Sequence, residues 1–144
     1  NTMYDYRATI VKVVDGDTVD VDIDLGFGVW LKDERVRLVG VDTPESRTRD
    51  LVEKAFGLAA KDFVKNFVEV EGADIVLVTA SYDSKGKFGR ILGDIHVDGN
   101  PLTTALLDNH MAVIYNAENK ELVQAAHEEN RKILLEAGTV TLPE

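Results

Sequence analysis

The sequence predicts an α+β protein, mainly β, in which a five-stranded Greek-key barrel is accompanied by three α-helices. Five short runs rich in Val, Ile and Leu are bounded by Gly or Asp turns, as strands commonly are. The first three runs follow one another directly, as in a meander, and a helical segment precedes the fourth. The 144 residues, 44% of them apolar, suffice for a hydrophobic core, so we expect a single domain over residues 1–144.

The five strands are expected at residues 6–14, 17–25, 34–41, 73–79 and 90–97. Asp15 and Gly16, between the first two strands, form the Asp-Gly pair that favours a two-residue hairpin turn. A three-strand meander, a helix and two further strands suit a small barrel of the oligonucleotide-binding type, the OB-fold. The loop before the third strand carries Phe27 and Trp30, which we expect to plug the barrel end; the alternative is a partner-binding patch.

The second strand alternates strictly between two kinds of side chain. Its apolar positions have one parity and its aspartates the other: Val19, Val21, Ile23 and Leu25 against Asp20, Asp22 and Asp24. We expect these three aspartates to face water, where they oppose aggregation. Asp17 has the apolar parity, and an inward carboxylate needs a cation or hydrogen-bond donors. The stretch does not match a calcium loop of the EF-hand kind. Counting from Asp20, the position that needs Gly holds Leu25, and the position that needs Glu holds Leu31.

Capping residues and helical spacing predict the first two helices. The first opens at Asp50, whose N-cap role is supported by Glu53 three residues later. Its apolar positions have helical spacing: Phe56, Ala60, Phe63 and Phe67. The second starts at Asn100 and Pro101, a cap residue followed by Pro in the first turn.

The third helix is expected from about Asn119 to Ala137, with Gly138 as its stop. Its predicted apolar stripe consists of Leu122, Ala126, Ile133 and Leu134. The three histidines have no metal-binding spacing and stay unassigned: His96, His110 and His127.

Composition excludes several classes of protein. The absence of Cys excludes disulfides and thiolate metal sites. No apolar run reaches the roughly 18 residues of a membrane span, so we expect no membrane partner. No secretory leader is recognisable, so we expect a cytoplasmic protein, with a mature secreted form as the alternative. We also expect a monomer. The formal net charge of −10 argues against indiscriminate binding to polyanions, so any nucleic-acid activity needs local positive charge.

The stretch RVRLVGVDTPES gathers polar residues at the end of an apolar strand: Arg37, Asp42, Thr43 and Glu45. Pro44 holds Thr43 extended and so fixes the direction of its carbonyl. A carbonyl beside a carboxylate suits a hard cation such as calcium. Taken alone, DTPE is also a common turn sequence.

The stretch KGKFGR adds three positive charges without an acid, from Lys85, Lys87 and Arg90. A basic turn flanked by Gly is most often a solvated hairpin. A functional interpretation requires Arg90 to lie close to Arg37, Asp17 and Asp42 in the folded protein. Two arginines could then bind one phosphate.

Taken together, VVDGDTVDV, VRLVGVDTPES and GKFGR occur in an order and at a spacing that resemble the staphylococcal (micrococcal) nuclease-like family, the thermonucleases. The resemblance covers roughly residues 6–116, and the last helix is in the expected place but only weakly similar.

The resemblance implies a role for each matched residue. Asp17 and Asp42 are expected to be the carboxylate ligands of one calcium ion, with the backbone carbonyl of Thr43 as a further ligand. Arg37 and Arg90 are expected to bind phosphate. Glu45 is expected to be the general base, or to position the attacking water.

The resemblance also implies the substrate and the products. Family members cut the bond to the 5′ oxygen of DNA and RNA and leave 3′-phosphates, and we expect single-stranded or flexible substrates to be preferred. Lys87, Phe88 and Tyr115 are the expected substrate contacts, although Phe88 stands where some relatives have Tyr.

The acidic composition departs from the strongly basic relatives. Seven cations could still line a groove: Arg35, Arg37, Arg47, Arg49, Lys85, Lys87 and Arg90. The alternative function is a catalytically inactive OB-fold module that binds nucleic acid or protein. Inactive relatives lose acidic ligands or arginines, and none of the expected ones is missing here.

Overall fold

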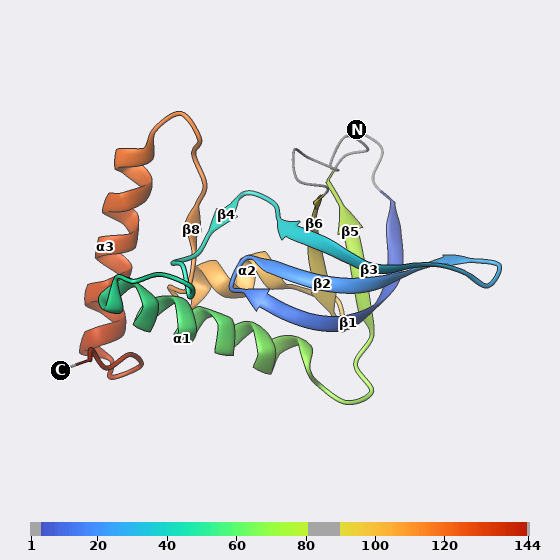
Figure 1. Cartoon of the computed structure of the whole chain (residues 1–144), viewed down its shortest axis with the longest axis horizontal. Coiled ribbons are helices and arrows are strands. Elements are labelled where there is room, and N and C mark those ends of the chain that lie inside the picture. Colours follow the sequence, from blue (N-terminus) through green and yellow to red (C-terminus); the bar gives the residue numbers. More distant parts are fainter. Residues whose placement is uncertain (1–3, 81–89, 144) are drawn as a thin grey trace.

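The computed structural model describes residues 4–80 and 90–143, and its elements follow in the order shown in Figure 1. The strands are β1 (Asp5–Asp15), β2 (Thr18–Gly26), β3 (Val29–Leu38), β4 (Val41–Asp42), β5 (Ile75–Thr79), β6 (Ile91–Val97), β7 (Asn100–Pro101) and β8 (Val113–Ile114). The helices are α1 (Leu51–Val68), α2 (Leu102–Asp108) and α3 (Lys120–Glu136).

Five strands close into a barrel in the order β1, β2, β3, β6, β5. The first three form an antiparallel meander, and β5 pairs antiparallel with both β1 and β6. A parallel pairing of β3 with β6, in which Arg37 lies opposite Leu92, closes the barrel. The predicted five-strand barrel with three helices is therefore confirmed. The sequence did not indicate the small second sheet of β4 and β8.

The barrel interior and the inner faces of the helices share one apolar core. Its most deeply buried side chains come from strands and helices alike: Val19, Val21, Val36, Leu38, Phe56, Val64, Leu77, Ile95, Leu102 and Leu106. Figure 1 shows α1 running beneath the barrel and α3 standing at the end opposite the tip of the β2–β3 hairpin. Within the described part of the chain, no helix is both long and apolar enough to cross a membrane.

The β2–β3 hairpin is longer than expected, because β3 begins at Val29 and not near residue 34. Its tip projects beyond the barrel (Figure 1). Phe27 is fully exposed and Trp30 is 39% exposed, so the prediction that they plug the barrel end is wrong. The physical reason is the turn: Gly26, Phe27 and Gly28 all have positive φ, and this tight bend leaves the Phe27 ring in solvent.

Asp20 does not face water as predicted, since it is only 7% exposed. Arg35 lies opposite Asp20 on β3, and its Nε and Nη2 donate to the two carboxylate oxygens at 2.9 and 3.1 Å. Asp22 accepts the backbone N–H of Asp33 at 2.8 Å. The acidic side of β2 is therefore largely occupied by partners from β3.

The start of α1 follows the prediction in part. The carboxylate of Asp50 accepts the N–H groups of Val52 and Glu53 at 3.0 and 3.2 Å, so Asp50 is the N-cap. Glu53 does not complete a capping box, because its carboxylate accepts the N–H of Glu45 at 3.0 Å. Thr48 accepts the N–H of Asp50 in its place.

The expected cap of α2 is wrong. Asn100 pairs with Val97 in the sheet and gives the helix no side-chain cap. The carboxylate of Asp94 on β6 accepts the N–H and the hydroxyl of Thr103 at 3.2 and 2.6 Å. A residue of the neighbouring strand thus satisfies the first turn of the helix.

The limits of α3 agree with the prediction, but its buried face differs. Asn119 caps the N–H of Leu122 at 3.0 Å, and Gly138 ends the helix region with a φ of 74°. Leu122, expected in the apolar stripe, is 58% exposed. The buried residues of this helix are His127 and Leu134.

Gly57 should be indispensable for the packing of α1. A Cβ at this position would overlap the carbonyl of Glu45 and lie 2.6 Å from the nitrogen of Ser46. Gly57→Ala gains about 1 kcal/mol of helix propensity, yet the overlap should lower the free energy of unfolding by about 1–3 kcal/mol. Urea denaturation measures this change.

Asp62→Ala is the matched control, because it also raises helix propensity, at an exposed position of α1. It should leave the stability unchanged or slightly raised. Equal stabilities of the two variants would contradict the close contact between Gly57 and the Glu45 loop.

Candidate active site

A polar pocket of about 300 Å³ lies where the β1–β2 turn meets the end of β3 and the loop that follows β4. Its lining combines carboxylates and guanidinium groups: Asp15, Asp17, Asp42 and Glu45 with Arg35, Arg37, Arg47 and Arg90. Five residues with predicted catalytic or metal roles thus line one pocket: Asp17, Arg37, Asp42, Glu45 and Arg90. Asp17 and Arg90 are more than seventy positions apart in the sequence.

The turn that carries Asp17 differs from the predicted one by a single residue. Asp15 pairs with Thr18, so the two turn residues are Gly16 and Asp17. Gly16 does not have a positive φ, so backbone conformation does not explain why Gly stands at this position. The reason is the close contact of its neighbours. A Cβ there would lie 2.9 Å from both Thr43 Oγ1 and Ala60 Cβ. Only Gly allows the turn to pack directly on α1 and the loop after β4.

Asp17 has the partners that an inward carboxylate requires. It accepts the hydroxyl of Thr18 at 3.0 Å and the backbone N–H of Thr43 at 3.3 Å. Its Oδ2 also lies 3.5 Å from Nη2 of Arg37. The expectation that a cation or hydrogen-bond donors receive the Asp17 carboxylate is confirmed.

Arg37 contacts several of the segments that form the pocket. Its Nη1 donates to the carbonyls of Leu38 and Val41, both at 2.8 Å. Its Nη2 lies 3.5 Å from Asp17 Oδ2 and 3.6 Å from Asp42 Oδ1. The side chain is 16% exposed, so one partly buried guanidinium fixes the curve of the chain after β3 and contacts both carboxylates.

His127 of α3, which the sequence left unassigned, reaches this pocket through Asp42. Its Nε2 lies 2.7 Å from Asp42 Oδ2, and the residue is 8% exposed. The other carboxylate oxygen of Asp42 faces Arg37. No local signal predicts this contact, because the two residues are 85 positions apart.

Glu45 lines the pocket, and its backbone is held from two sides. Glu53 accepts its N–H at 3.0 Å, and the missing side chain of Gly57 leaves room for its carbonyl. Partial burial raises the pKa of the Glu45 carboxyl, and the negative charges of Asp15 and Asp17 add to this effect.

Three further arginines line the pocket. Arg35 is held by Asp20, and this hydrogen bond raises the pKa of its guanidinium. Arg47 and Arg90 complete the basic part of the lining, whereas Arg49 is not among the lining residues.

The predicted substrate contacts can be located only in part. Tyr115 follows β8 and is 50% exposed, and its ring centroid lies 5.9 Å from the guanidinium carbon of Arg37. It therefore stands beside the pocket with one face open. Lys87 and Phe88, together with Lys85, lie outside the described residues.

The carboxylates fit a weakly held hard cation. Asp17 and Asp42 direct one oxygen each toward the same guanidinium nitrogen, so two oxygen donors converge. Among residues 4–80 and 90–143, no group of three or more His, Cys, Asp or Glu side chains is arranged to hold a metal. The chain could thus offer calcium two carboxylates, and the other ligands would be a carbonyl, water or a substrate oxygen.

Comparison with known proteins finds relatives that are named nucleases. A family model described as staphylococcal nuclease homologue matches residues 35–137. A thermonuclease from Staphylococcus intermedius is 31% identical over 129 residues, which cover 85% of this chain and 70% of that protein. An uncharacterized endonuclease from Escherichia coli is 29% identical over 120 residues, which cover 83% of this chain and 67% of that protein.

Endonuclease YncB from Bacillus subtilis is 29% identical over 121 residues, and there the chain spans 54% of the relative's length. Asp17 precedes the residues that the family model matches, and only the barrel brings it to the others. The family model covers well over half of the chain, and the thermonuclease is similar over most of its length. The chain therefore belongs to the staphylococcal nuclease homologue family.

Proposed function

We propose that this protein is a calcium-dependent nuclease that hydrolyses phosphodiester bonds of DNA and RNA and leaves 3′-phosphate products. One observation carries the proposal: two carboxylates, two arginines and a glutamate of raised pKa line one pocket of about 300 Å³. The names of the relatives support the nuclease activity. The choice of bond follows from the resemblance of the three sequence motifs.

Each group of the pocket has a task that matches its chemistry. Asp17 and Asp42, with the carbonyl of Thr43, would hold calcium, which when bound supplies Lewis-acid polarisation of a phosphate oxygen. Arg37 and Arg90 provide N–H donors for the charge that develops on the phosphate oxygens. The raised pKa of Glu45 makes its carboxylate a better base toward the attacking water.

Cleavage of single-stranded DNA, with calcium or with a chelator, tests the proposed function. A 5′-labelled oligonucleotide should be shortened only in the presence of calcium, and the labelled products should carry 3′-phosphates. Absence of cleavage under both conditions, with binding retained, would favour the inactive binding module.

Glu45→Gln should lower turnover by about 10²–10⁴-fold, because a general base typically contributes that much to the rate. Calcium affinity should change only a few-fold, since Glu45 is not proposed as a ligand. Steady-state kinetics and calorimetric titration measure the two quantities. Glu118→Gln, an exposed change of the same kind away from the pocket, is the control. A native rate in Glu45→Gln would remove Glu45 from the mechanism.

His127 should act as a positioning residue for Asp42, because its ring occupies one carboxylate oxygen and leaves the other facing the pocket. His127→Leu keeps bulk but removes the hydrogen bond. Outer partners of metal ligands typically contribute about 10–100-fold to metal affinity. Calcium affinity measured by calorimetry should therefore fall by about that factor, and His127→Gln should restore part of it.

The control for His127 is Asn130→Ala, which removes a different tie of α3, the hydrogen bond of 3.1 Å to the carbonyl of Ala112. This variant loosens the helix without touching Asp42. Its calcium affinity should stay within a few-fold of the native value. Equal losses in the two variants would mean that His127 only anchors α3.

A further inference from the structure

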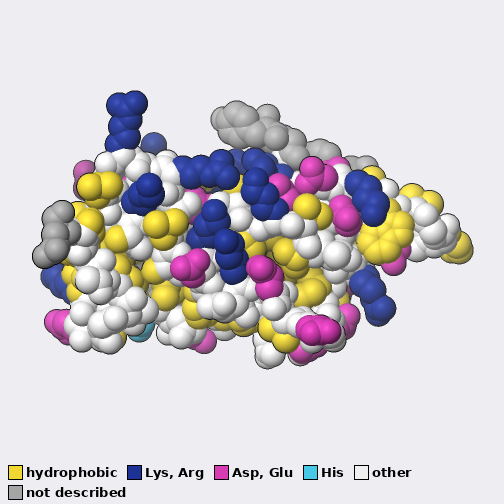
Figure 2. All heavy atoms as spheres, turned by 60° about the horizontal axis from the view of Figure 1, so that its bottom comes forward, with side chains coloured by type: hydrophobic (Ala, Val, Ile, Leu, Met, Phe, Trp, Pro, Cys, Tyr) yellow, Lys and Arg dark blue, Asp and Glu magenta, His cyan; other side chains and the backbone are white. Residues whose placement is uncertain are grey.

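A second groove, of about 370 Å³, lies between β1 and α1, outside the active-site pocket. Its charged lining consists of Lys12 from β1 with Lys61, Lys65 and Glu69 from α1, and aliphatic side chains of β1 complete it. Three lysines against one glutamate make this groove locally basic in a chain whose formal net charge is −10. Figure 2 shows the side of the molecule that carries α1, where Lys and Arg side chains gather in the middle of the face.

Within the part of the chain that the structure describes, the three lysines lack carboxylate partners. Among the described residues, no Asp or Glu oxygen lies within 4.0 Å of the ammonium groups of Lys12, Lys61 or Lys65. Lys32 and Arg35, in contrast, each have a carboxylate partner on β2. Like charges that line one groove repel each other, and an anion with several charges removes that repulsion.

The groove and the active-site pocket are lined by consecutive stretches of β1. On β1, Val14 and Asp15 line the pocket, while residues 10–13 line the groove. On α1, Gly57 packs on the Glu45 carbonyl and Ala60 faces Gly16, immediately before Lys61. Helix α1 thus packs on the turn and the loop that line the active-site pocket, and the lysines of the groove lie farther along β1 and α1.

We propose that this groove binds the phosphodiester backbone of the nucleic-acid strand whose scissile phosphate occupies the active-site pocket. The inference rests on the proposed function, because it extends the path of the same substrate. The lysine ammonium groups would neutralise phosphates without reading bases.

The spacing sets the length of this contact. Lys61 and Lys65 are four and eight residues beyond Gly57, which corresponds to about 6 and 12 Å along the helix axis. Lys12 is three residues from Asp15, about 10 Å along the strand. A stacked strand rises about 3.4 Å per nucleotide, so the lysines reach phosphates up to about three or four nucleotides from the cleaved bond.

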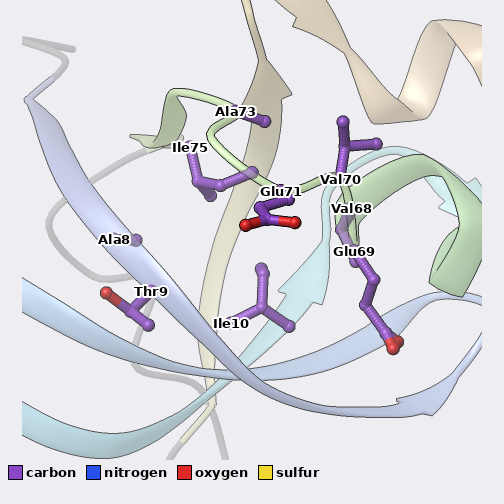
Figure 3. Close-up of a pocket in the computed structure, with 9 residues that line it drawn as sticks. All are labelled: Ala8, Thr9, Ile10, Val68, Glu69, Val70, Glu71, Ala73 and Ile75. Carbon is purple, nitrogen blue, oxygen red and sulfur yellow. The ribbon is translucent and has the colours of Figure 1, made fainter.

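An acidic hollow adjoins the groove at the end where Ile10 and Glu69 lie. Figure 3 shows the adjoining hollow of about 430 Å³, which shares Ile10 and Glu69 with the groove and also contains Glu71. It is lined by no Lys or Arg of the described chain. Phosphates would be repelled there, so the bound part of the nucleic-acid strand should not extend beyond Lys65 and Glu69.

The test replaces Lys12, Lys61 and Lys65 together by Gln. The control replaces Lys32, Lys120 and Lys132, which removes the same charge from positions outside the groove. Binding of a fluorescent single strand of about twelve nucleotides is measured by anisotropy over a range of salt, without calcium. Cleavage of this strand and of a dinucleotide is then measured with calcium.

The groove variant should bind the long strand about 10–100-fold more weakly at low salt, and its log–log salt slope should be shallower by about 2. Its cleavage of the dinucleotide should equal the native rate. The control should differ less than threefold from native in every measurement. Equal binding by the groove variant and the control would overturn the inference, whether or not the native protein cleaves. Failure of the native protein to cleave either substrate would instead reject the proposed function.

Discussion

The guanidinium of Arg37 is the contact on which the geometry of the site depends. Arg37 lies on β3, opposite Thr18 of β2 and Leu92 of β6, so it sits where the barrel closes. Its two terminal nitrogens hold the carbonyls that curve the chain after β3 and the carboxylates of Asp17 and Asp42. Barrel closure and convergence of the acids therefore share one partly buried cation, whose loss would leave two carboxylates close together without the positive charge between them.

Small residues decide how closely the helix and the loops approach this cation. Gly16 lets the β1–β2 turn touch Ala60, and Gly57 lets α1 touch the carbonyl of Glu45. The first turn of the same helix carries Glu53, whose carboxylate accepts the N–H of Glu45. Helix α1 therefore buries an apolar face in the core and at the same time fixes the loop that carries the candidate base. Because interiors are close-packed, one added methyl group is felt at both places.

The distribution of charge matters more for this protein than its sum. The chain carries a formal net charge of −10, yet its cations gather around one pocket and along the adjoining groove. Several acids are already engaged: Asp20 by Arg35, Asp94 by the first turn of α2, and Asp50 by the start of α1. In the pocket four arginines balance four carboxylates, and in the groove three lysines exceed one glutamate, so an acidic total coexists with local charge of a different sign. Screening in salt limits the field of each charge to about 10 Å.

The sequence by itself determined the barrel, the start of α1, the limits of α3, and the motif residues of the pocket, because strand alternation, capping and motif spacing are local signals. It did not reveal that Asp20 is buried, that Asp94 caps α2, or that His127 binds Asp42 across 85 positions. Those features are pairings between segments that only the closed barrel and the docked helices bring together. A side chain's parity says which way it points from its own strand, whereas its burial and its partner depend on what the rest of the chain places there.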